Sequence, residues 1–203
     1  RIMSSLVGPK GQVIAFEPDP VNNSLFKSNT KKIKQLKLFS YALGKTNETS
    51  TFYHSLVKSG SHSLIKENPW GEVETYQVEV KSLDSILDDL KIDKVDFMKI
   101  DIEGYEPELF LGMTKTLERS PEIRIIMEFA PIAIRSGGVQ PINFLETLKS
   151  LGFEIREIKE GGVTRDCENL IDKNQLLTDG KFFTNVFLQR TGRSLPEGVN
   201  LIQ

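Results

Sequence analysis

The chain has 203 residues, 38% of them hydrophobic, with a formal net charge of -2 and a sequence pI of about 5.8. This length suits one domain with its own core and is short for two. The charge balance provides neither the basic surface typical of nucleic-acid binding nor a polybasic segment for an anionic membrane, and the single cysteine excludes an internal disulfide. We therefore expect a cytoplasmic, single-domain protein (residues 1–203) that binds neither nucleic acid nor membranes.

The first half of the chain alternates predicted helices and strands. In chain order we expect the end of a helix at 2–9, a strand at 12–17, a helix begun by Asp19 and Pro20, and a strand at 36–43. Asp is a favoured helix cap, and proline at the first helical position sacrifices no hydrogen bond. The polar stretch 45–70 shows no period and is expected to be irregular.

The second half continues this alternation. Polar and apolar residues alternate over 72–80, which predicts a half-buried edge strand. The other expected elements are a helix at 83–90 capped by Ser82, a strand at 94–102, a helix at 107–117, a strand at 122–129, a loop at 130–139, a helix at 141–151 and strands at 153–158 and 182–190. Such an order is typical of a mostly parallel sheet covered by helices on both faces.

Acidic residues stand at the ends of the predicted parallel strands, where open α/β sheets bind their ligands. Glu17 can accept hydrogen bonds from both hydroxyls of a ribose, which by itself indicates an adenosine-containing cofactor. Asp101 and Glu103 follow the strand at 94–102. A carboxylate buried there needs a cationic partner, such as a sulfonium or an amino group of a ligand. Gly104 allows a sharp turn or a close approach to a ligand.

Further candidate residues follow from the same topology. Glu128 ends the next strand and can hydrogen-bond a substrate or join Asp101 and Glu103 at a divalent ion. Nothing in the spacing demands a metal, and we expect none. The only two histidines are His54 and His62, of which we take His62 as a candidate base for a hydroxyl proton.

Four segments, in order, resemble the FkbM family of O-methyltransferases: VIAFEPDP at 13–20, YALG at 41–44, SLD at 82–84 and VDFMKIDIEGYE at 95–106. The last segment is the most specific, and the resemblance continues to about Pro131. It implies a Rossmann-like class I α/β sandwich, with a mostly parallel sheet of order 3-2-1-4-5-7-6 whose last strand is antiparallel. Members of the family bind S-adenosylmethionine and mostly methylate hydroxyl groups on sugars, polyketides and other secondary metabolites.

The resemblance also implies roles by position. At the cofactor it implies Glu17 and Pro18 for the ribose, Tyr41, Ala42 and Leu43 along the adenine, and Asp101 beside the methionine part and the reacting methyl group. On the substrate side it implies Glu103 and Gly104, with Glu128 from the topology argument. A hydroxyl oxygen of a small-molecule acceptor would attack the sulfonium methyl group while Asp101 or His62 takes the proton.

One part of the family pattern does not occur in this sequence. The first strand and its glycine-rich loop belong in the middle of the sheet, between the strands at 12–17 and 94–102. We therefore expect the chain, which opens at Arg1 within a helix, to lack an N-terminal part and to bind cofactor weakly by itself. Two alternatives stay open: a nicotinamide-dependent oxidoreductase, which Glu17 suits equally, and a methyltransferase-like module without cofactor that serves as a binding partner.

Overall fold

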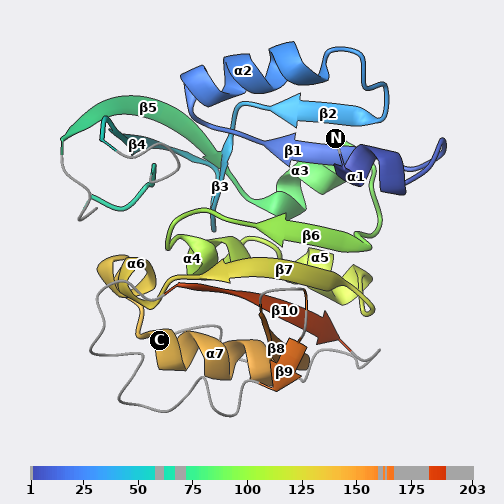
Figure 1. The fold of residues 1–203 in the computed structure, drawn as a ribbon, viewed down its shortest axis with the longest axis vertical. Coiled ribbons are helices and arrows are strands. Elements are labelled where there is room, and N and C mark those ends of the chain that lie inside the picture. Colours follow the sequence, from blue (N-terminus) through green and yellow to red (C-terminus); the bar gives the residue numbers. More distant parts are fainter. Residues whose placement is uncertain are drawn as a thin grey trace.

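The computed structural model describes residues 2–57, 62–66, 72–159, 162, 164–166 and 183–190. Its helices are α1 (Ile2–Leu6), α2 (Pro20–Thr30), α3 (Leu83–Asp89), α4 (Glu106–Leu111), α5 (Thr114–Arg119), α6 (Pro131–Ser136) and α7 (Pro141–Ser150). Its strands are β1 (Val13–Phe16), β2 (Leu36–Phe39), β3 (Ala42–Leu43), β4 (Glu48–Ser55), β5 (Val73–Lys81), β6 (Phe97–Ile100), β7 (Arg124–Phe129), β8 (Phe153–Ile158), β9 (Thr164–Asp166) and β10 (Thr184–Arg190). The fold is mixed α/β (Figure 1).

The largest sheet has the order β6-β7-β10-β8-β9. β6 runs parallel to β7, whereas β10 runs antiparallel to both β7 and β8. Alternate residues of β7 and β10 are buried, and they pack with the apolar faces of α4, α5 and α7. The side chains of Phe110, Phe129 and Phe144 are fully buried in this core. Most of the hydrophobic stabilisation therefore lies in this half of the molecule.

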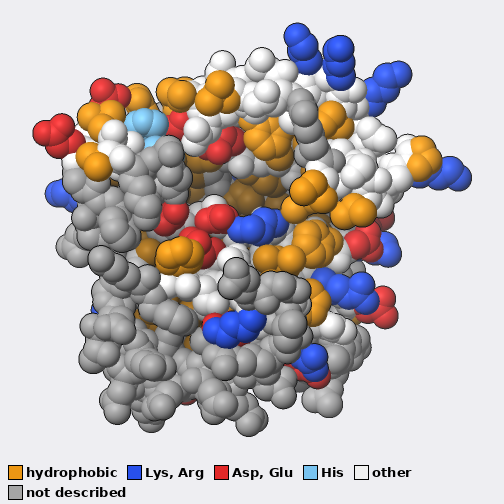
Figure 2. Space-filling model, viewed as in Figure 1, with side chains coloured by type: hydrophobic (Ala, Val, Ile, Leu, Met, Phe, Trp, Pro, Cys, Tyr) orange, Lys and Arg blue, Asp and Glu red, His pale blue; other side chains and the backbone are white. Residues whose placement is uncertain are grey.

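β1 and β2 form a separate two-stranded parallel sheet. In the part of the chain that the structure describes, no ladder joins β1 to β6, although both arrows point the same way in Figure 1. All four residues of β1 are only half-buried, and Phe97 at the start of β6 is 43% exposed. Figure 2 shows a hollow near the centre of this face, with apolar side chains on its floor and acidic side chains at its left margin.

The third sheet has the order β3-β5-β4 and lies on the side toward which β1 and β6 point (Figure 1). The interpretation of 72–80 as an edge strand is wrong, because β5 pairs with β3 on one side and β4 on the other. Polar–apolar alternation indicates that one face of a strand is exposed, but it does not indicate whether the strand lies at the edge or in the middle of the sheet. The stretch 45–70, expected to be irregular, contains the eight-residue strand β4.

Three other expected boundaries are also wrong. The strand predicted at 36–43 is two strands, because the chain leaves β2 after Phe39 and joins β5 through β3. The helix predicted at 107–117 is split into α4 and α5 at Gly112, where an added Cβ would lie 1.9 Å from the carbonyl oxygen of Gly44. The loop predicted at 130–139 contains α6, which begins with Pro131 at a position that proline favours.

The predicted helix caps are confirmed. The carboxylate of Asp19 accepts hydrogen bonds from the N–H groups of Val21 and Asn22 at the start of α2, and Ser82 Oγ accepts one from Ser85 N–H at the start of α3. Residues 159–181, predicted to form a polar connection, lie largely outside the described residues. Among the helices that the structure describes, none is long and apolar enough to cross a membrane.

Candidate functional site

Glu17 directly follows β1, as the sequence predicts. Its side chain is half-buried, and Oε1 accepts a hydrogen bond of 2.9 Å from Asp19 N–H. Burial raises the pKa of this carboxyl group above its usual value, against the opposing effect of that backbone hydrogen bond. Among the described residues, Oε2 of Glu17 has no hydrogen-bond partner. Glu17 therefore offers an incompletely satisfied carboxylate at the tip of β1.

Asp101 directly follows β6 but differs from expectation in its surroundings. The interpretation of Asp101 as a buried carboxylate is wrong, because its side chain is 50% exposed. It already has a cation, since Lys99 Nζ lies 2.9 Å from Asp101 Oδ2. The two-residue spacing of Lys99 and Asp101 indicates this ion pair, because residues i and i+2 of a strand point to the same face.

Acidic side chains come together at the turn after β6, in a group that we call the acidic turn: Asp101, Glu103 and Glu128. One carboxylate oxygen from each of Asp101, Glu103 and Glu128 lies within 4.8 Å of the other two. Glu103 has a backbone φ of +53°, a strained conformation for a residue with a side chain. Such an acidic group attracts a cation or hydrogen-bonds a polyol, and the three oxygens are also of the type that Mg²⁺ accepts.

Gly104 has a φ of +96°, which confirms the sharp turn expected at this position. A Cβ built there would lie 2.5 Å from the carbonyl carbon of Ala133, so the glycine allows a close approach of α6. The close contact is thus with the protein's own backbone, and it fixes where Glu103 projects.

The residues expected along the adenine divide into two groups. Tyr41 is half-buried, stacks on Phe39 with ring centroids 5.7 Å apart, and carries Lys81 Nζ 4.0 Å from its ring centroid. Ala42 and Leu43 are buried, each in a different hydrophobic cluster. The structure therefore presents the ring of Tyr41, while the two other side chains pack inward.

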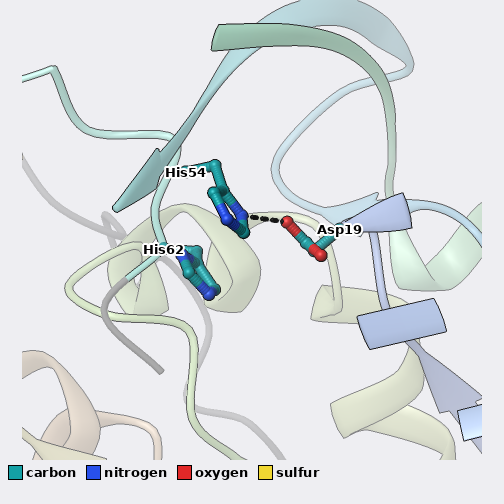
Figure 3. A group of neighbouring side chains, drawn as sticks. All are labelled: Asp19, His54 and His62. Atoms are coloured by element: carbon teal, nitrogen blue, oxygen red, sulfur yellow. Dashed lines mark hydrogen bonds and ion pairs between the residues drawn. The ribbon is translucent and has the colours of Figure 1, made fainter. Parts of the chain in front are cut away.

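A second cluster, which we call the histidine cluster, consists of Asp19, His54 and His62 (Figure 3). Asp19 is fully buried, and its Oδ2 lies 2.5 Å from Nδ1 of His54 on β4. The rings of His54 and His62 stack with centroids 4.1 Å apart and planes 5° from parallel. Ser55 N–H donates a 3.0 Å hydrogen bond to Nδ1 of His62.

The sequence interpretation missed most of the histidine cluster. The sequence predicts Asp19 only as a helix cap and His54 only as part of an irregular stretch, whereas His54 lies on β4. The paired phenylalanines of β1 and β2 were also missed: Phe16 stacks on Phe39 with centroids 5.8 Å apart. For β4 the sequence signal is weak: residues 48–55 contain Thr, Phe and Tyr, which favour strands, but they do not alternate between polar and apolar.

The histidine cluster and the acidic turn are neighbours. Ser63, next to His62, donates a hydrogen bond of 3.0 Å from Oγ to the carbonyl oxygen of Glu103. On the other side, Asp19 N–H is bonded to Glu17. The chain thus links the end of β1, the histidine cluster and the end of β6 by direct hydrogen bonds, which defines one candidate site.

A different hollow, of about 580 Å³, lies where β1 and β2 begin. Its lining includes Lys10, Lys32, Lys34 and Lys37. Because ligands of open α/β sheets bind at the carboxyl ends of the strands, this basic region lies at the opposite end from the candidate site. The acidic residues of the candidate site and these lysines therefore lie at opposite ends of the strands.

The chain is similar to known methyltransferases. The 2-O-methyltransferase NoeI of Sinorhizobium fredii is 25% identical over 125 residues, which are 55% of this chain and 51% of NoeI, so the chain spans about half the length of this curated relative. Among solved structures, methyltransferase FkbM from Methylobacillus flagellatus has a TM-score of 0.46 and 12% identity, covering 93% of this chain and 40% of that one. Residues 2–155 match the family model described as the methyltransferase FkbM domain. With most of its length covered by that model, the chain belongs to the FkbM methyltransferase family.

Proposed function

We propose that the protein is an S-adenosylmethionine-dependent methyltransferase that methylates a hydroxyl group of a sugar or another small metabolite. Family membership supports methyl transfer, and NoeI is named as a 2-O-methyltransferase. The observation that carries the proposal is the arrangement of Glu17 and the acidic turn, which directly follow the ends of β1 and β6.

The proposed fold is the Rossmann-like class I sandwich. Its support is the strand order: β2-β1 on one side and β6-β7-β10-β8 on the other, with β10 antiparallel to its neighbours. The family resemblance implies the order 3-2-1-4-5-7-6, in which strand 1 lies in the middle of the sheet. The two runs of strands follow this order when strand 1 is omitted. In this order β1 and β6 lie on either side of the omitted position, and their carboxyl ends point the same way (Figure 1).

The residues present fit the nucleoside part of this cofactor. Oε2 of Glu17 is available to hydroxyl donors, and Pro18, which directly follows, has a fixed backbone φ that limits the conformations of this turn. The half-buried ring of Tyr41 can stack on a base if Lys81 Nζ, which lies 4.0 Å from the ring centroid, moves aside. When bound, S-adenosylmethionine supplies the electrophilic methyl group; the residues of the chain hold and orient it.

The remaining roles are proposed from position. Asp101 places negative charge near the sulfonium, and its exposed side chain allows Lys99 to move aside for a ligand. Glu103 and Glu128 bind the acceptor's hydroxyl groups, and Gly104 sets the turn that presents Glu103. Ala42 and Leu43 act from the protein interior by supporting the backbone beneath the adenine.

The replacement Glu17→Gln tests the proposal. We expect S-adenosylmethionine to bind the intact protein about 10- to 100-fold more weakly after this change, because charge-assisted hydrogen bonds to the ribose are lost. Isothermal titration calorimetry measures the effect, with NAD as a second ligand. The matched control is Glu122→Gln, at an exposed acid before β7 at the other end of the sheet. Tighter binding of NAD than of S-adenosylmethionine, or equal affinity in both variants, would contradict the proposal.

A further inference from the structure

The ring of His54 is contacted on several sides by other residues of the site. Asp19 lies against one ring nitrogen, His62 covers one ring face, and Tyr76 approaches with its ring centroid 5.8 Å away at an angle of 63°. The side chain is 16% exposed, so one part of the ring still reaches solvent. A ring fixed from several sides in this way is preoriented for a specific contact.

Asp19 determines which nitrogen of His54 carries a proton. Oδ1 of Asp19 accepts N–H groups from Val21 and Asn22, as a carboxylate does at a helix start. Its other oxygen, Oδ2, lies 2.5 Å from Nδ1 of His54, which therefore donates. The neutral imidazole then has its lone pair on Nε2. Among the described residues, Nε2 has no hydrogen-bond partner.

His62 has the other tautomer, with its proton on Nε2 and its lone pair on Nδ1. Because Ser55 N–H donates to Nδ1 of His62, that nitrogen is unprotonated, and the neutral ring carries its proton on Nε2. Burial lowers the pKa of His62, and the neighbouring His54 lowers it further. His62 is thus held neutral with Nε2 as a donor, which makes it unsuited to accept a proton at Nε2.

The histidine cluster also has the right place for chemistry at the site. Asp19 N–H contacts the carboxylate proposed for the ribose, and the residue after His62 contacts the carbonyl of Glu103 on the acceptor side. His54 therefore lies on the link between the proposed cofactor and acceptor sites.

We propose that His54 is the general base of the methyl transfer, with Asp19 as its positioning residue. This proposal rests on the proposed function. As the acceptor oxygen forms its bond to the methyl carbon, the electron pair of the carbon–sulfur bond returns to sulfur, and the hydroxyl proton goes to Nε2 of His54. The imidazolium faces the Asp19 carboxylate and later releases the proton to water.

A metal site made by the same three residues is the competing interpretation. One ligand atom from each lies within 4.8 Å of the others. However, two ligands of a tetrahedral zinc ion are roughly 3.3 Å apart, whereas Asp19 Oδ2 and His54 Nδ1 are 2.5 Å apart, in hydrogen-bond contact. The Ser55 hydrogen bond at Nδ1 also leaves the proton of neutral His62 on Nε2, where a metal would need a lone pair.

The first test reads the tautomers without any reaction. In the intact protein, ¹⁵N–¹H correlation spectra of the imidazole rings should show Nδ1–H for His54 and Nε2–H for His62. Asp19→Asn should shift the tautomer of His54 while leaving α2 folded, because asparagine is an equally good helix cap. Nε2–H on His54 of the unmodified protein would overturn the proposal.

The second test measures turnover. His54→Gln should lower kcat by about 10²- to 10⁴-fold, the usual contribution of a general base, with little change in the Kd of S-adenosylmethionine. His62→Gln, which keeps a donor N–H, should lower kcat far less. If His54→Gln binds the cofactor normally and its kcat is unchanged, His54 is not the general base, although the proposed function still holds. If the unmodified protein does not bind S-adenosylmethionine, the proposed function itself is refuted. Stoichiometric binding of Zn²⁺ alone, abolished by His54→Gln and required for turnover, would establish the metal site instead.

Discussion

The carboxyl group of Glu106 is subject to two opposing effects. It is fully buried at the start of α4, where Oε1 accepts the N–H of Ile102, while Oε2 has no hydrogen-bond partner among the residues that the structure describes. Burial is the largest effect, and with the nearby charge of Asp101 it raises the pKa of Glu106 to about 7, against the backbone hydrogen bonds that lower it. Glu106 thus keeps its proton in the folded protein under conditions where an unfolded chain releases it.

This difference makes stability depend on pH. Between the ordinary pKa of 4.5 and about 7, the folded state binds more protons than the unfolded state, so the free energy of unfolding falls as pH rises through this range. Glu106→Gln has no carboxyl group to ionise, so its free energy of unfolding should not fall in this range. We expect the free energy of unfolding of the variant to exceed that of the unmodified protein by on the order of 2–3 kcal/mol at pH 8 and to match it near pH 4.5. Urea denaturation across this pH range measures the difference, and parallel pH curves for the two proteins would contradict it.

The candidate site was partly predictable residue by residue. Glu17, Asp101 and Glu103 lie where strand topology places them, because the ends of parallel strands are fixed by the fold. The pairing of Asp101 with Lys99 was visible as a two-residue spacing. The contact of Asp19 with His54 was not predictable, since it joins residues 35 positions apart through a hairpin that local patterns did not reveal.

Among the elements, α5 depends on a side chain from another helix. Its own N-cap residue, Met113, provides no side-chain hydrogen bond. Asp84 of α3 does so instead: its carboxylate accepts the N–H groups of Lys115 and Thr116 and the hydroxyl of Thr116, the last at 2.7 Å. The short SLD segment therefore starts one helix with its serine and another with its aspartate.

We expect Asp84→Ala to lower the free energy of unfolding by about 2–3 kcal/mol, because it removes charged acceptors from a partly buried helix start. Asp84→Asn, which keeps one acceptor oxygen, should lose about half as much. Urea midpoints measure both changes, with Asp93→Ala at an exposed position as the control. An Asp84→Ala midpoint equal to that of the control would show that α5 does not need this cap.

Elements with strong local signals were predicted well. Asp19-Pro20 and Ser82 mark the helix starts, and the apolar runs of β1, β7 and β8 mark strands. The failures occurred where tertiary contacts decide the outcome. The break between α4 and α5 exists because the backbone at Gly112 packs against that of Gly44, a contact between residues distant in sequence.

Across the whole molecule, stability is distributed unevenly. β10 is hydrogen-bonded on both sides, and every second residue from Thr184 to Arg190 is buried. β1 pairs only with β2 in the described part of the chain, and its residues are half-buried. Because apolar burial contributes most of the stabilisation, the two regions differ in the free energy of local opening.

Hydrogen exchange should reveal this difference. We expect the amides of β1 and β2 to exchange at least about tenfold faster than those of β7 and β10, by opening without global unfolding. Mass spectrometry of peptides from a labelling time course measures the rates. Saturating S-adenosylmethionine should slow β1 and leave β8 unchanged. Equal protection of β1 and β10 without ligand would show that the molecule opens only as one unit.

The hydrogen bond from Ser63 to the Glu103 carbonyl has a practical consequence for loop grafting. Anyone who transplants the β4–β5 hairpin from a relative to change acceptor preference also replaces the donor at position 63, a buried hydroxyl. A graft without serine or threonine at this position removes a hydrogen bond to the carbonyl of Glu103, whose left-handed backbone conformation is itself unfavourable. Chimeras should therefore carry the hairpin and this hydroxyl together, or exchange the D-I-E-G segment at the same time.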